Sequence, residues 1–268
     1  MTVIDGRGPI RDLLLNLTLT QRLSKRDIRG KYQGSTFGVL WSLATPLMLL
    51  TAYWFLLGYL LQAKFGATPQ KMYPVILFSG LIIHLFFAEV VGRAPGLIFE
   101  HKTYVKKVVF PLSILPWMTV ATALFHFLVN TTILLIGQWL IVGALPATWP
   151  LIYVVTLPLL PMMLGLAWFL SALSVFLRDI QQVVPLALTL MMFLSPIFVP
   201  MELIPERFAP ALYLNPTSTV ILAVRDVAIY GQQPDYLQLM AYSSVSVFVM
   251  LLGYAFFNKT RTGFADVL

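Results

Sequence analysis

The most constraining feature of this sequence is the length of its uncharged stretches. Residues 37–61 contain no Asp, Glu, Lys or Arg, and between residues 108 and 201 only Arg178 and Asp179 carry a charge. A helix needs about 20 mostly apolar residues to cross a bilayer. Charged residues make up 11% of the chain, against about 25% in an ordinary soluble domain, and a disordered chain would need low hydrophobicity with high charge. The sequence therefore predicts an all-α integral membrane protein with several spans.

Six spans are predicted when turn-forming residues and charges are used as boundaries. Residues 143–150 (Gly-Ala-Leu-Pro-Ala-Thr-Trp-Pro) are a turn signal that divides the longest apolar stretch. With both termini in the cytoplasm, most of the 18 Lys and Arg residues fall on the cytoplasmic side, as the positive-inside rule requires. A seventh span would move Lys259 and Arg261 outside. The predicted spans are residues 37–61, 73–92, 112–142, 151–177, 183–199 and 236–257.

Residues 200–235 are ambiguous between a seventh span and a re-entrant segment. Asn215-Pro216 would break a spanning helix early, and Arg225 and Asp226 would add charge late in it. A pair of short re-entrant helices before the last span fits better, because non-helical backbone is tolerated at membrane depth where protein or a wet cavity shields it. Arg225 and Asp226 then either line the outer mouth of a pathway or satisfy broken backbone, and the sequence leaves both roles open.

The first 36 residues form a separate cytoplasmic segment with helical periodicity. An apolar stripe at helical spacing is followed by a basic stripe at the same spacing, which indicates a helix lying in the membrane interface. Each basic residue near an anionic leaflet contributes about 1 kcal/mol of attraction. The alternative is that these charges only set the topology. The apolar stripe is Ile10, Leu13, Leu14 and Leu17, and the basic stripe is Arg22, Lys25, Arg26 and Arg29.

A second extramembrane segment, residues 93–107, lies in the predicted cytoplasmic loop between spans two and three. A pure topology signal would need only its lysines. A short amphipathic helix that docks a cytoplasmic partner would use both charge signs and the neighbouring apolar and aromatic residues. The candidate docking residues are Glu100, His101, Lys102, Tyr104, Val105, Lys106 and Lys107.

A few ionisable and aromatic residues lie within the predicted spans. Histidines 84 and 126 fall mid-span and are expected to pack as neutral side chains, because a charge at membrane depth is expensive. Glu89 and Arg93 are four residues apart, a spacing that suits an ion pair along one helix. The aromatic side chains of Tyr53 and Trp54 are weaker candidates for lining a channel, since sugar rings present apolar CH faces that stack on aromatic planes.

The sequence lacks the signatures of a phosphate-hydrolysing enzyme. The only Gly-Lys pair is Gly30-Lys31, and Lys25 stands where a phosphate loop needs its first glycine. There is no cysteine, and the three histidines are far apart, so a metal site is not expected. The chain itself is therefore expected to be no enzyme and to hold no cofactor. The positive charge excess suits cytoplasmic loops, so no nucleic-acid partner is expected.

Residues 26–47 (RDIRGKYQGSTFGVLWSLATPL) resemble the motif that opens the transmembrane domain in permeases of the type-2 class of ABC exporters. More narrowly, the motif is similar to that of subunits that export O-antigen, capsule or teichoic-acid polysaccharide. The resemblance continues in order along nearly the whole chain. Its later parts are residues 175–180 (VFLRDI), 195–198 (SPIF) with 204–205 (IP), and 214–216 (LNP) with Arg225 and Gly231 downstream.

The resemblance implies a role for each segment. Residues 1–36 would be the interface helix and residues 37–268 the transmembrane domain. Residues 93–107 would couple the chain to a separate ATP-binding cassette subunit, which brings ATP and Mg. Two copies of the chain would pair around a conduit, with residues 200–235 near its outer mouth. The family's location would be the bacterial inner membrane.

The expected substrate is a lipid-linked polysaccharide, with O-antigen as first choice, capsule as second and teichoic acid as third. One alternative is a type-2 permease for a drug or another lipid. A second is an ion-coupled secondary transporter, which predicts inverted repeats and buried carboxylates that are not visible here. A third is an integral-membrane transferase acting on lipid-linked sugars, for which the chain offers poor acid–base candidates in His84 and Glu89.

Overall fold

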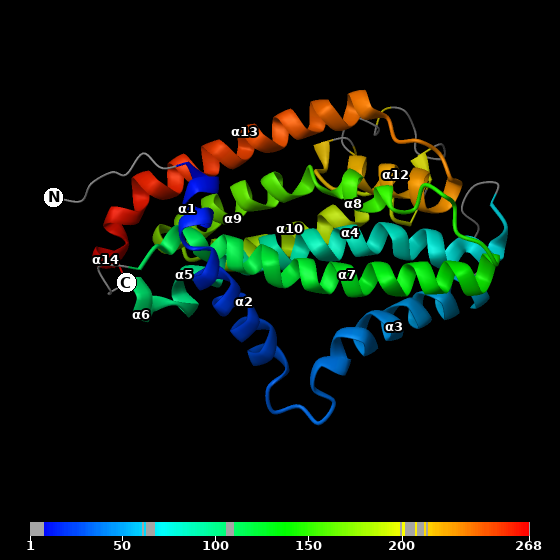
Figure 1. The fold of residues 1–268 in the computed structure, drawn as a ribbon, viewed down its shortest axis with the longest axis horizontal. Helices are drawn as coiled ribbons and strands as arrows, with labels where there is room; N and C mark the ends of the chain where they lie inside the picture. The colour runs from blue at the N-terminus through cyan, green and yellow to red at the C-terminus, as the bar shows by residue number, and fades with distance from the viewer. Residues whose placement is uncertain are drawn as a thin grey trace.

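The structure is a computed structural model that describes residues 8–60, 62, 68–105, 110–198, 200–201, 207, 212 and 214–267. Every described secondary-structure element is helical, which confirms the all-α prediction. Most of the long helices lie side by side along the long axis of the molecule (Figure 1). The first and last helices, α1 (Pro9–Leu15) and α14 (Phe264–Val267), lie at the same end as α5 (Leu97–Glu100) and α6 (Lys102–Val105) (Figure 1).

Five helical stretches of the described chain are long and apolar enough to cross a membrane. They match the first, second, third, fourth and last predicted spans, and confirm the membrane class. The stretches are Trp41–Leu60, Gln70–Glu100, Leu112–Val142, Leu151–Phe176 and Tyr236–Gly263. Their main helices are α3 (Trp41–Tyr53), α4 (Tyr73–Arg93), α7 (Leu115–Val142), α8 (Leu151–Thr156), α9 (Leu159–Phe176) and α13 (Tyr236–Thr260).

The fifth predicted span, residues 183–199, corresponds to a shorter helix. Helix α10 covers Ile180–Phe193, 14 residues that extend about 21 Å at 1.5 Å per residue, against about 30 Å of hydrocarbon. The helix ends before residue 199 because a turn at Ser195-Pro196 follows it. The side-chain amide of Asn215 donates to the backbone carbonyls of Met191 and Leu194 at 2.8 and 3.0 Å. These bonds provide partners for carbonyls at the end of α10. A count of six spans stays a prediction.

In the described part of residues 200–235, the longest helical segment begins at Ser218. Helix α12 (Ser218–Arg225) continues as a wider π-helical turn, Asp226–Tyr230, and ends at Gly231, whose φ of 69° suits glycine. The segment packs on α4 and α8. At 8 residues α12 is too short to cross a bilayer, so the described residues contain no seventh span, and re-entry into the membrane stays a prediction.

The predicted interface helix is two helices, α1 and α2 (Leu17–Tyr32), with a break at Asn16. The carboxylate of Asp12 in α1 accepts hydrogen bonds from the hydroxyls of Tyr254 at 2.6 Å and Ser113 at 2.8 Å. These bonds fix α1 against one end of the bundle. Helix α2 then buries Leu23 and Ser24 and packs along α7, so it is attached to the bundle, and its position in the membrane interface stays a prediction.

Helices α9 and α13 form the most extensive helix pair of the described chain. They cross at Gly165 and Gly253, where the backbones touch: a Cβ on Gly253 would lie 2.0 Å from the carbonyl oxygen of Gly165. Small residues allow this close approach between membrane helices. By contrast, only 12% of the most apolar part of Trp41–Leu60 is buried. Helix α3 therefore lies at the edge of the bundle, below α4 and α7 in Figure 1.

Candidate functional site

Three helices each present two polar side chains spaced four residues apart, and the six side chains meet where the helices touch. A spacing of four places both members on one helix face. We name this group the three-helix cluster. Its members are Asp27 and Lys31 from α2, Glu89 and Arg93 from α4, and Thr122 and His126 from α7.

One layer of the three-helix cluster is centred on Asp27. The guanidinium of Arg93 donates to both oxygens of this carboxylate at 2.6 and 2.7 Å, and the hydroxyl of Thr122 donates at 3.0 Å. Burial raises the pKa of Asp27, but the bonds and charge of Arg93 together with the Thr122 bond outweigh it, so the pKa lies below its ordinary value. Asp27 is therefore ionised at neutral pH. Arg93 of α4 also donates to Glu100 at 3.0 Å, so Asp27 of α2 is connected through Arg93 to the end of α5.

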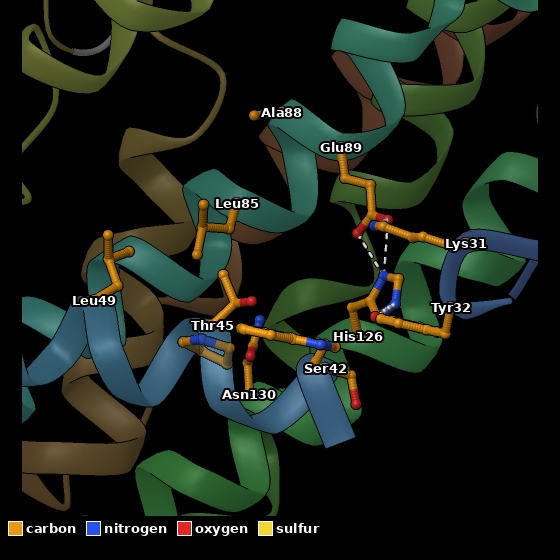
Figure 2. Close-up of a pocket in the computed structure, with 12 residues that line it drawn as sticks. Lys31, Tyr32, Ser42, Thr45, Leu49, Leu85, Ala88, Glu89, His126 and Asn130 are labelled. Atoms are coloured by element: carbon orange, nitrogen blue, oxygen red, sulfur yellow. Dashed lines mark hydrogen bonds and ion pairs between the residues drawn. The ribbon is translucent and has the colours of Figure 1, made fainter. Parts of the chain in front are cut away.

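The other layer is centred on Glu89 (Figure 2). Its carboxylate lies 2.7 and 2.9 Å from Nδ1 of His126 and accepts a bond from the Lys31 ammonium at 3.0 Å. The opposite ring nitrogen, Nε2, lies 2.8 Å from the hydroxyl of Tyr32. Burial and the Glu89 carboxylate both raise the pKa of Tyr32. The imidazole of His126 thus bridges the Glu89 carboxylate and the Tyr32 hydroxyl.

The predicted ion pair between Glu89 and Arg93 along α4 is wrong. Each side chain instead takes its partner from α2, Lys31 for Glu89 and Asp27 for Arg93. An ion pair along one exposed helix contributes only about 0.2–0.5 kcal/mol, whereas partners on a packed neighbouring helix also receive charge-assisted hydrogen bonds away from water. The matching spacing of Asp27 and Lys31 was the sequence signal for this arrangement.

The two histidines of the spans differ in their surroundings. His84 is 4% exposed, and its Nδ1 has no hydrogen-bond partner among the described residues, so it packs as predicted. His126 does more than pack, because both ring nitrogens are used within the three-helix cluster. No group of three or more His, Cys, Asp or Glu side chains suited to a metal ion occurs in the described part of the chain.

The structure brings the two predicted cytoplasmic sets together. The predicted docking segment forms two short helical turns, α5 and α6, separated at His101. Tyr104 stacks on Phe110, with ring centres 4.3 Å apart, and on His101 at 5.6 Å. Its hydroxyl accepts a bond from Arg26 of α2 at 2.8 Å. The interface helix and the docking segment are thus joined twice, through Arg26–Tyr104 and through Asp27–Arg93–Glu100.

The remaining predicted cytoplasmic residues are less informative. Lys102 lies over the ring of Phe99, 5.4 Å from its centre, a cation–π distance. Lys106, Lys107 and the side chain of Val105 lie outside the described residues. The other basic residues of the predicted stripe are exposed on α2, and they are Arg22, Lys25 and Arg29.

Among the candidates for the outer mouth, Arg225 has a structural position. It is 2% exposed and donates to the backbone carbonyls of Pro196, Ile197 at 3.0 Å and Ile76 at 3.4 Å. These bonds satisfy broken backbone after α10, which is one of the two roles left open by the sequence, and a place at the outer mouth stays a prediction. Gly80 leaves the space for its guanidinium, because a Cβ there would lie 3.0 Å from Nη2.

The other three candidates for the outer mouth or the channel lining are Asp226, Tyr53 and Trp54. Asp226 is partly exposed at the end of α12. Tyr53 packs near Phe198, with ring centres 5.9 Å apart, and Trp54 is 49% exposed. Their role in lining a channel stays a prediction.

A hollow of about 600 Å³ opens beside the Glu89 layer, between the end of α2 and helices α3, α4 and α7 (Figure 2). A second hollow, of about 510 Å³, adjoins it on the Asp27 side. Such volumes are typical of small-molecule sites. The first hollow is lined by Lys31, Tyr32, Trp41, Ser42, Thr45, Pro46, Leu49, Leu85, Ala88, Glu89, His126 and Asn130.

Comparison with known proteins places this architecture in a family. The sequence profile described as "ABC-2 type transporter" matches residues 18–229. Two relatives named O-antigen export system permease protein RfbA, from Klebsiella pneumoniae and Myxococcus xanthus, are 28% and 29% identical over 267 and 266 residues. These alignments cover 97% and 96% of this chain and 96% and 98% of the relatives. The polysialic acid transport protein KpsM of Escherichia coli is 23% identical over 249 residues, covering 90% of this chain and 92% of that protein. Because the profile covers most of the sequence, including the three-helix cluster, this chain belongs to the ABC-2 type transporter family.

Proposed function

We propose that this chain is the transmembrane subunit of an ATP-driven exporter that moves a lipid-linked cell-surface polysaccharide, O-antigen first, across the bacterial inner membrane. The observation that carries the proposal is the end-to-end similarity to permeases named for O-antigen export, at 28–29% identity. The long apolar helices and the large hollow near the α2 end support a transport role.

ATP hydrolysis belongs to separate cassette subunits in this proposal, with ATP and Mg bound there. The sequence contains no phosphate loop, so the chain would contribute force transmission and a path rather than chemistry. Helices α5 and α6 would dock on the cassette subunits. They lie at the end of the bundle that holds α1 and α14, which supports a cytoplasmic position for that end (Figure 1).

A second copy of the chain is expected to complete the conduit. Helix α3 and its continuation expose large apolar side chains, such as Met48 at 64% and Tyr59 at 66%, and only 12% of their most apolar part is buried. In a bilayer this face meets lipid or another protein. A face against the second copy would allow α3 to line a path between the two copies, with two cassette subunits below.

The proposed mechanism begins when ATP closes the cassette subunits against each other. Their motion displaces α5 and α6, and the displacement passes to α2 through Arg26–Tyr104 and through Glu100–Arg93–Asp27. Because residues 33–40 connect α2 to α3, the shift would then reach the weakly packed helix beside the hollow. A neutral path suits a long polymer, since strong binding sites would stall it.

Co-purification of the tagged chain from its native membrane, followed by an ATPase assay, tests this proposal. We expect a nucleotide-binding subunit in about equal amount and loss of surface O-antigen when the gene is deleted. Tyr104→Asp should release the cassette subunit, because it places a charge in the aromatic stack with Phe110 and His101. Tyr104→Phe is the matched control and should retain it. A chain that purifies alone without ATPase activity would refute the proposal.

Capsule is the second candidate substrate, favoured by the similarity to the polysialic acid transport protein. Its identity of 23% is lower than that of the O-antigen permeases. Loss of capsule with intact O-antigen in the deletion strain would select this alternative. Retention of both polymers would favour a permease for another lipid or a drug.

A further inference from the structure

We propose that the 600 Å³ hollow binds a neutral, hydroxyl-rich sugar unit of the polymer being exported, with the side-chain amide of Asn130 as its main hydrogen-bonding group. This inference rests on the proposed function and adds a location and a ligand class to it. Three features of the hollow carry it: an unused buried amide, a balanced charge, and a mixed polar and apolar wall.

Asn130 is buried and lines the hollow, but its side chain is unused within the protein. It is 8% exposed, lies one helical turn beyond His126 on α7, and makes no side-chain hydrogen bond to any described residue. Because the side chain lines the hollow, its amide can be reached there by water or by a ligand. An amide offers two donors and an acceptor, which matches a pair of neighbouring sugar hydroxyls.

The charges around the hollow favour an uncharged ligand over a phosphate. Lys31 is the one Lys or Arg among the lining residues, and its ammonium is bound to Glu89 at 3.0 Å. The His126 ring lies between Glu89 and Tyr32, with both nitrogens occupied. A phosphate entering here would face the Glu89 carboxylate and would have to displace an existing ion pair. A hydroxyl can donate to that carboxylate without separating any charges.

The remaining wall suits the two-sided surface of a sugar ring. The hydroxyls of Ser42 and Thr45 belong to α3 and lie on the same wall as the indole of Trp41, which is 40% exposed. Pro46 and Leu49 extend this wall with apolar surface. Thr45 of α3 and Asn130 of α7 both line the hollow (Figure 2). A ring with apolar CH faces and a polar rim can contact both kinds of surface at once.

The hollow is also connected to the segments that would receive force from the cassette subunits. Lys31 and Tyr32 of its lining belong to α2, and Asp27 one turn earlier is held by Arg93. A displacement of α2 would therefore change the hollow directly. A weak site whose wall moves in each cycle could hold a polymer unit and release it.

Site-specific labelling tests this inference, because the chain contains no cysteine and one introduced thiol is unique in this subunit. Thr45→Cys places the thiol on the wall of the hollow. Ala121→Cys, on α7 in a separate apolar groove against α2, is the matched control. Each variant is purified with its cassette subunits in lipid nanodiscs, and the rate of maleimide labelling is measured. The probes are O-polysaccharide released from its lipid, and inorganic pyrophosphate.

We expect the polysaccharide to slow labelling at position 45 at least five-fold and to leave position 121 unchanged, whereas pyrophosphate should affect neither. Adding Asn130→Leu, or the smaller Asn130→Ala if the first variant fails to assemble, should remove most of the protection. Protection by pyrophosphate, equal effects at both positions, or full protection without the amide would overturn the inference. If the complex exports polysaccharide while position 45 stays unprotected, only this inference fails. If it exports none, the proposed function fails.

Discussion

The link between α2 and α4 leads to a quantitative prediction about Arg93. Its guanidinium binds Asp27 through two bonds of 2.6 and 2.7 Å, and binds Glu100 at 3.0 and 3.3 Å. The Asp27 side chain is 16% exposed, whereas that of Glu100 is 46% exposed. The two ion pairs should therefore differ in strength, although they share one arginine.

The expected magnitudes follow from the exposure of each partner. Charge-assisted hydrogen bonds contribute about 1.5–3 kcal/mol when shielded, and exposed ion pairs contribute about 0.2–1 kcal/mol. We expect a coupling free energy of about 2 kcal/mol between Arg93 and Asp27, and below about 1 kcal/mol between Arg93 and Glu100. Arg93→Met alone should lower the free energy of unfolding by about 3 kcal/mol, because it leaves the Asp27 carboxylate partly buried with only Thr122.

Double-mutant cycles with Arg93→Met, Asp27→Asn and Glu100→Gln measure these terms. The free energy of unfolding would be followed by circular dichroism as SDS is added to mixed micelles, at two salt concentrations. Salt should weaken the Glu100 coupling much more than the Asp27 coupling. A Glu100 coupling as large as that of Asp27, or an Asp27 coupling below about 0.5 kcal/mol, would refute the assignment of Asp27 as the main partner.

Two further predictions concern helix packing and pH. Gly253→Ala would place a methyl group 2.0 Å from the Gly165 carbonyl oxygen, so α13 and α9 must separate. We expect the free energy of unfolding to fall by about 3 kcal/mol or more. Gly137→Ala is the control, because its methyl group meets nothing within 4 Å and should be neutral or stabilising. Equal melting temperatures for the two variants would contradict this packing. The pKa of Asp27 is lower in the folded chain than in the unfolded chain. The contribution of this carboxylate to the free energy of unfolding is therefore complete above the ordinary pKa of about 3.9, and it is lost as the pH falls through the lower pKa of the folded chain. The stability difference between wild type and Asp27→Asn should therefore be constant from pH 7 to pH 5 and shrink below about pH 4, and a difference that already shrinks between pH 7 and pH 5 would argue against this carboxylate.

The sequence predicts the long elements well because their signal is summed over many residues. The uncharged stretches locate α3, α4, α7 and α13 close to their observed bounds. It overextends the fifth span, since the apolar run continues to residue 199 and composition does not register the turn at Ser195-Pro196. The broken backbone there is satisfied by Asn215 and Arg225, which lie well downstream in the sequence.

The candidate site is predicted only in part, because its contacts join separate helices. Sequence spacing predicts a Glu89–Arg93 ion pair, which is wrong, because it cannot show that α2 packs on α7 with its charged side chains within reach of α4. The partnerships with Lys31 and Asp27 depend on that neighbour. The sequence predicts Tyr104 as a docking residue from its mixed surroundings, and that role stays a prediction, whereas its observed bond to Arg26 depends on how α2 folds back onto the bundle. Periodicity in the sequence predicts the polar and apolar faces of each helix, whereas the contacts between helices depend on how the whole chain packs.

The order of charges in the three-helix cluster limits how α2 can travel. If α2 slid one helical turn, about 5.4 Å, along α4, Lys31 would replace Asp27 beside Arg93 and like charges would meet. The charges of the three-helix cluster therefore favour the observed axial position of α2 and oppose the position one helical turn away. In the proposed mechanism, a force applied at the end that holds α5 and α6 would move α2, α4 and α7 together, and α3 would change its position most. If two copies pair as proposed, a small movement of α2, α4 and α7 in each copy would produce a larger change at the interface between the copies.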